Sequence, residues 1–149
     1  MRFTLRTAFV AFAIAGFACA WFAKQAAVRS FELSRIKEIT AVSGAPVFIG
    51  DGEHPFGGCG SYRGIIIYVE DCGPSLLKPL RLDCVKRVTG IEMKCQNKPE
   101  LLDIAAALSS LKDVCVEKDS PDNVDFIAAI ESFSNRRPLV SVDYWHSEY

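Results

Sequence analysis

Histidines, closely paired cysteines and excess basic charge are all scarce in this chain of 149 residues. The two histidines, His54 and His146, leave few side chains suited to acid–base chemistry near neutral pH. The six cysteines include no Cys-x-x-Cys pair, the spacing that is typical of structural zinc sites. We therefore expect no metal site, no cofactor and no catalytic residues.

The balance of charge also excludes a class of partner. The chain has 17 Lys and Arg against 18 Asp and Glu, and Arg2 and Arg6 lie in its N-terminal segment. The rest is therefore slightly acidic and offers no basic field for nucleic acid. A glycine-rich stretch, residues 50–64, lacks the Gly-Lys-Ser/Thr element of a phosphate-binding loop. No nucleic-acid partner is expected.

An uncharged apolar run of 17 residues, Thr7 to Ala23, is the strongest signal in the sequence. As a helix it would reach about 25 Å, slightly short of the roughly 30 Å bilayer core. It is longer than the usual signal-peptide core of about 7 to 15 residues. Cleavage after Ala20 is an alternative, since Ala18 and Ala20 fit the small-residue rule. Because Trp21 suits the membrane interface, we favour an uncleaved, single-pass anchor over residues 7–23.

The orientation of this anchor is open on charge alone. Arg2 and Arg6 place the short tail inside, whereas four basic residues (Lys24, Arg29, Arg35 and Lys37) follow on the other side. A very short basic tail before an apolar core is typical of signal-anchors. We therefore expect the domain on the exported side of the membrane.

Three parts are expected along the chain: the anchor at 1–23, a juxtamembrane segment at 24–63 and an α/β domain at 64–149. The juxtamembrane segment reads as a helix over 24–43 that ends before Gly44 and Pro46, a short strand over 47–49 and the glycine-rich loop.

Beyond residue 64 the pattern alternates between strand and helix. The expected strands are 64–69, 90–95, 114–117 and 140–144, and the expected helices between them are 75–84, 100–111 and 122–133. Corresponding strand positions are 26, 23 and 26 residues apart. Repeats of this length predict a stack of parallel strands with helices on one face.

Two segments carry a more specific resemblance: Val88-x-x-Ile91-x-Met93 and Leu111-x-x-Val114-x-Val116 look like degenerate leucine-rich repeats. Four further residue groups match features of short membrane-anchored leucine-rich-repeat-like proteins. These features are an arginine-flanked anchor, a helix that ends at a glycine, a leucine-rich helix and the strand after it, and the groups are 2–6, 43–45, 76–80 and 86–91. The chain thus resembles the short membrane-anchored leucine-rich-repeat-like proteins of planctomycete bacteria. The resemblance implies a leucine-rich-repeat-like architecture rather than a particular activity.

Alternation along the strands separates two faces of the expected sheet. One face, which includes Ile65, Ile67 and Ile91, should pack under the helices. The other should be uncovered, as in solenoids that bind partners on an open sheet. Its candidate partner-binding residues are Ile66, Tyr68, Glu92, Lys94, Glu117 and Asp143. An ordinary solvated sheet face is the alternative interpretation.

The cysteines after the anchor are odd in number, and most fit buried thiols. Parallel neighbouring strands would place Cys72 and Cys95 close enough for a disulfide, which is a further hypothesis. The function expected from all these features is a non-catalytic, membrane-anchored protein-interaction or envelope module. The alternative is a small exported enzyme that uses His54 and Cys59 in the glycine-rich loop.

Overall fold

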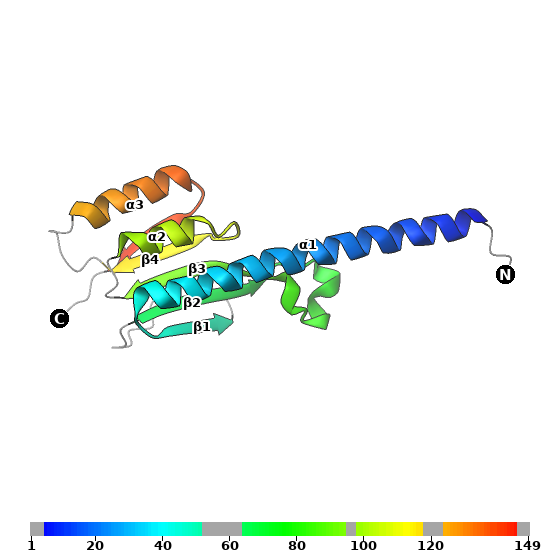
Figure 1. The fold of residues 1–149 in the computed structure, drawn as a ribbon, viewed down its shortest axis with the longest axis horizontal. Coiled ribbons are helices and arrows are strands. Elements are labelled where there is room, and N and C mark those ends of the chain that lie inside the picture. The colour runs from blue at the N-terminus through cyan, green and yellow to red at the C-terminus, as the bar shows by residue number, and fades with distance from the viewer. Residues whose placement is uncertain (1–4, 52–63, 95–97, 118–123, 146–149) are drawn as a thin grey trace.

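The described part of the chain contains a long N-terminal helix, a five-stranded sheet and shorter helices that connect its strands (Figure 1). The computed structural model describes residues 5–51, 64–94, 98–117 and 124–145, with only the backbone at Asp51, Lys94, Glu117 and Trp145. In chain order the elements are α1 (Leu5–Ser43), β1 (Val47–Asp51), β2 (Gly64–Asp71), the 3₁₀ helices η1 (Ser75–Leu80) and η2 (Asp83–Val85), β3 (Lys86–Lys94), α2 (Pro99–Ala106), β4 (Asp113–Glu117), α3 (Val124–Arg136) and β5 (Ser141–Trp145).

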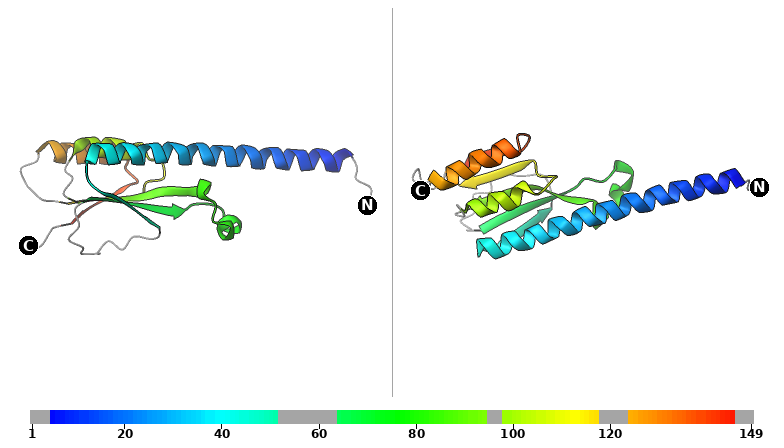
Figure 2. Two further views of the ribbon diagram at one scale, coloured as in Figure 1. Left: turned by 60° about the horizontal axis from the view of Figure 1, so that its bottom comes forward. Right: turned by 45° about the horizontal axis from the view of Figure 1, so that its top comes forward.

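The five strands lie in the sheet in the order in which they occur in the chain, β1-β2-β3-β4-β5. Three of the four neighbouring pairs are parallel, and β2–β3 is antiparallel. The three α-helices form one layer on a single face of this sheet, with α2 between α1 and α3 (Figure 2). The protein is therefore a mixed α/β fold with a mostly parallel sheet.

The uniformly parallel stack predicted from the sequence is wrong at β2–β3, and a leucine-rich-repeat-like stack is not confirmed. The helix expected over 75–84 is replaced by η1 and η2, with Pro79 inside η1. Proline lacks the amide donor and clashes with the preceding turn, so an α-helix does not form there. Parallel neighbours need a crossover, usually a helix, to carry the chain back across the sheet. Without that helix, β3 returns beside β2 in the opposite direction.

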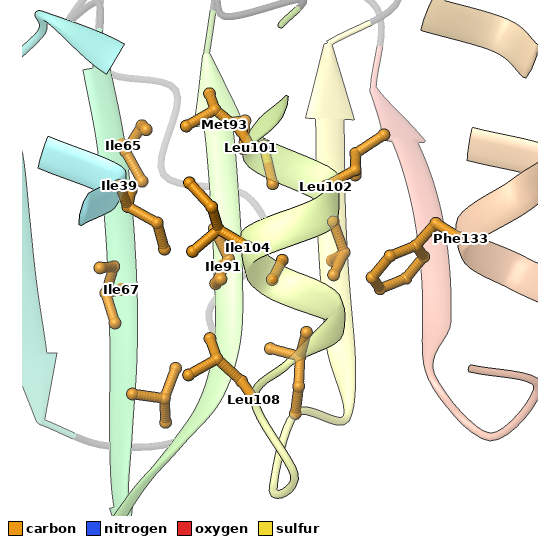
Figure 3. Packing of buried hydrophobic residues seen from close by; sticks show 14 of the residues in the cluster. Ile39, Ile65, Ile67, Ile91, Met93, Leu101, Leu102, Ile104, Leu108 and Phe133 are labelled. Atoms are coloured by element: carbon orange, nitrogen blue, oxygen red, sulfur yellow. The ribbon is translucent and has the colours of Figure 1, made fainter. Parts of the chain in front are cut away.

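The predicted inward face of the strands is confirmed. The helices cover four buried strand residues, Ile65, Ile67, Ile91 and Met93. Phe133 of α3 belongs to the same apolar cluster (Figure 3). An irregularity in the β2–β3 register between Tyr68 and Val69 places Val88, rather than Thr89, opposite Val69. Each such buried apolar side chain contributes about 1.5 to 3 kcal/mol to folding.

Helix α1 continues without a break from the apolar run into the core. Ile36 and Ile39 near its C-terminal end belong to the same apolar cluster as the strands. The helix ends as predicted at Ser43, before Gly44, whose positive φ of 63° suits a residue without a Cβ. The Nζ of Lys98 donates hydrogen bonds to the carbonyls of Val42 (2.8 Å) and Ser43 (2.9 Å), which stabilises this helix end.

Candidate functional site

The first half of α1 projects away from the sheet (Figure 1). Its most apolar 18-residue window has a mean hydropathy of 1.7, and none of that window is buried within the protein. Phe9, Phe12 and Phe17 are among its exposed large side chains. With 39 residues the whole helix is about 58 Å long. It is therefore long and apolar enough to cross a membrane with its first half while the second half packs on the domain.

A buried arginine joins α1 to the sheet at the point where the helix reaches the domain. Arg87 of β3 is 5% exposed. Its guanidinium donates hydrogen bonds to the carbonyls of Cys84 (2.8 Å), Lys86 (2.7 Å) and Gln25 (3.4 Å), and to the Gln25 side-chain oxygen. One side chain thus connects α1, η2 and β3.

A buried carboxylate, Glu32 of α1, lies near this arginine and is fully shielded from solvent. The Val88 amide donates to its Oε2 (3.3 Å), and the Arg29 guanidinium is 3.8 Å from the same oxygen. Burial raises the pKa of Glu32, while the Val88 hydrogen bond and the charges of Arg87 and Arg29 oppose that rise. We name Gln25, Arg29, Glu32 and Arg87 the junction cluster.

The sequence analysis missed the junction cluster. The buried stripe of α1 is Glu32, Ile36, Ile39 and Ser43. Glu32 therefore occupies an apolar helix face at helical spacing, which is the local signal that could have identified it. Its partner on β3 is more than fifty residues away in the chain, so the pairing itself had no local signal.

Substitution of Glu32 by glutamine should remove one component of the pH dependence of stability. A raised pKa in the folded state means that folding takes up a proton between the unfolded and the folded pKa. The wild type should therefore lose stability relative to Glu32→Gln as pH rises from the ordinary glutamate value through the raised one. Chemical unfolding of both full-length proteins in detergent micelles between about pH 4 and 8 measures this difference. A difference that is constant with pH would contradict the raised pKa.

The sheet face opposite the helices is less open than the sequence predicted. Tyr68 and Glu92 are buried, at 8% and 9% exposure, and the Tyr68 hydroxyl donates to Glu92 Oε2 at 3.0 Å. Their expected exposure is therefore wrong. Ile66 is half-buried and Asp143 is exposed. The side chains of the other two candidates, Lys94 and Glu117, lie outside the described part, and binding of a partner to this face stays a prediction.

An aromatic side chain that the sequence analysis did not select is exposed on the same face. Phe48 of the edge strand β1 is 51% exposed and lies opposite Ile66 in the β1–β2 register. An edge strand leaves backbone groups available to a partner. The short Val47–Ile49 run predicted the strand, but its position at the edge of the sheet is a tertiary property.

The predicted Cys72–Cys95 disulfide is wrong, because Cys72 is a free thiol. The antiparallel β2–β3 pair explains this. Asp71, next to Cys72, pairs with Lys86, whereas Lys94, next to Cys95, pairs with Gly64 at the other end of the strands.

The remaining chemical candidates lie outside the described residues. These are His54 and Cys59 of the proposed enzyme alternative, and His146. Within the described ranges, no three His, Cys, Asp or Glu side chains gather in a way that could hold a metal ion. Comparisons with protein-family models, with curated proteins and with solved structures gave no match to this chain.

Proposed function

We propose that this protein is a single-pass, membrane-anchored, non-catalytic interaction module, with its α/β domain on the exported side of the membrane. One observation carries the proposal: the helix that holds the apolar run is also the helix that packs into the core of the domain. The domain is thus joined to its anchor without an intervening loop. Such a connection holds the domain at a defined orientation to the bilayer.

The junction cluster supports this interpretation. Arg87 connects the sheet to Gln25, which lies two residues beyond the apolar run. Further along α1, the buried Glu32 accepts a hydrogen bond from the Val88 amide of β3. Hydrogen bonds to a charged group are worth about 1.5 to 3 kcal/mol each. They restrict rotation of the domain about α1, which suits presentation of one surface to a partner.

The second half of the sheet keeps the strand–helix alternation expected of a repeat. From β3 to β5, three parallel strands are connected by α2 and α3 on one face. This arrangement supports a leucine-rich-repeat-like relationship for residues 86–145, and that relationship favours protein binding. We place the docking surface on the opposite face, at the β1 edge of the sheet, around Phe48 and Ile66.

Site-specific photocrosslinking tests the docking surface. The full-length chain is expressed in its native host, so that it reaches its natural membrane. Benzoylphenylalanine replaces Phe48 in one variant and Val124 in the matched control. Val124 is 72% exposed but begins α3 on the helix side of the sheet. We expect a protein adduct of one defined mass at position 48 and none at 124. No adduct at 48, or the same adducts at both positions, would contradict the proposed docking surface.

A further inference from the structure

The connection between β2 and β3 exposes leucines on a polar domain. Leu76 is 89% exposed and Leu80 is 63% exposed, and no residue of η1 is buried. The same short segment carries two exposed cationic residues, Lys78 and Arg81. Leucines that protrude beside basic residues are typical of surfaces that enter the interface of a membrane.

This leucine segment, Pro74–Leu82, lies at the end of the sheet that faces the apolar half of α1 (Figures 1 and 2). The contacts agree, since η2, which follows the leucine segment, packs against α1, and Arg87, two residues after η2, donates to Gln25. Gln25 follows the last residue of the apolar run, Ala23, by two positions. The leucine segment is therefore close to the level at which α1 would leave the bilayer.

Local contacts fix the leucine segment in its protruding shape. The Leu77 amide donates to the Pro74 carbonyl (2.8 Å), and the Arg81 amide donates to the Lys78 carbonyl (3.1 Å). Arg81 has a φ of 45°, a left-handed conformation that costs a non-glycine residue about 1 kcal/mol or more. The exposed leucines are thus held away from the core instead of folding back onto it.

We propose that the leucine segment docks on the surface of an anionic bilayer, with Leu76 and Leu80 inserted at the headgroup level and Lys78 and Arg81 beside lipid phosphates. This inference rests on the proposed function, in which α1 spans the membrane. Apolar insertion and attraction between cations and anionic lipids both favour the docked state. The segment would give the domain a second contact with the membrane, in addition to α1.

Lipid photocrosslinking of the full-length chain tests this proposal. The protein is reconstituted in vesicles of phosphatidylglycerol and phosphatidylcholine, with benzoylphenylalanine at Leu76, at Phe12 or at Val124. Phe12 reports on the membrane span, and exposed Val124 reports on the start of α3, a helix that lies across the domain from the leucine segment (Figure 1). We expect lipid adducts at Phe12 and at Leu76, with the yield at Leu76 at least about fivefold above that at Val124.

The outcomes separate this inference from the proposed function. Absence of lipid adducts at Phe12 would overturn the membrane span and the docking that depends on it. Adducts at Phe12 with equal yields at Leu76 and Val124 would overturn the docking alone. In the Lys78→Glu/Arg81→Glu variant, the yield at Leu76 should fall by roughly threefold or more. An unchanged yield in that variant would overturn the assignment of the two cations to lipid phosphates.

Discussion

Replacement of Arg87 by methionine is expected to lower the free energy of unfolding by about 3 to 5 kcal/mol. Methionine keeps much of the apolar volume but removes the charge and every donor. The carbonyls of Cys84, Lys86 and Gln25 would lose the hydrogen bonds from Arg87, and buried Glu32 would lose a stabilising positive charge. Since small domains are stable by only about 5 to 15 kcal/mol, this loss is a large share of the total free energy of unfolding.

Chemical unfolding of the full-length protein in detergent micelles measures this loss. The matched control is Arg136→Met, because Arg136 is exposed and its ion pair with Asp103 (2.6 Å) lies at the surface. We expect the control to lose less than about 1 kcal/mol. Addition of Glu32→Gln to Arg87→Met should recover part of the stability, since the uncompensated carboxylate is then absent. Equal losses for Arg87→Met and Arg136→Met would contradict the role given to the junction cluster.

A double substitution in the apolar half of α1, Ile14→Arg with Phe17→Arg, is expected to remove the protein from the membrane. Both side chains are exposed on α1, at 64% and 78%. Each arginine near the centre of a span costs about 2.5 to 3.5 kcal/mol, and each apolar residue lost forfeits about 0.3 to 0.6 kcal/mol. The apolar run is already short, so roughly 6 to 8 kcal/mol exceeds what its remaining residues provide.

Alkaline extraction of membranes measures this effect as the fraction of protein that stays in the pellet. We expect most of the wild type in the pellet and most of the double variant in the supernatant. The matched control, Val124→Arg with Ile127→Arg, changes two exposed apolar residues of α3 instead. That control should stay in the pellet. A double variant of α1 that is retained as well as the wild type would contradict a membrane-spanning role for this helix.

The Arg87 variant and the Ile14/Phe17 double variant test the two attachments of α1. The first tests how α1 is held by the domain, and the second tests how α1 is held by the bilayer. If both results are as expected, the orientation of the sheet to the membrane is set by α1 and the junction cluster. The docking of the leucine segment would then be a consequence of that orientation.

Much of the secondary structure could be predicted because its signals are local. The apolar run and the helix end at Gly44 depend on the residues in the segment itself. The alternation at Ile65, Ile67, Ile91 and Met93 likewise marks the helix-facing side of β2 and β3, whichever way the neighbouring strand runs. These features are therefore correct even though the parallel stack is not.

Only the tertiary structure decided the direction of β3, the burial of the Tyr68–Glu92 pair and the partnership of Glu32 with Arg87. Strand direction depends on the path of the connection, and here Pro79 and the left-handed Arg81 prevented the expected helix. The helical spacing of Glu32 with Ile36 and Ile39 marks a buried face of α1, but it does not show that Val88 donates a hydrogen bond to the carboxylate. The electrostatic pairing and the position of the leucine segment at one end of the sheet depend on residues far apart in the chain, and local periodicity carries no information about which residues meet across such distances.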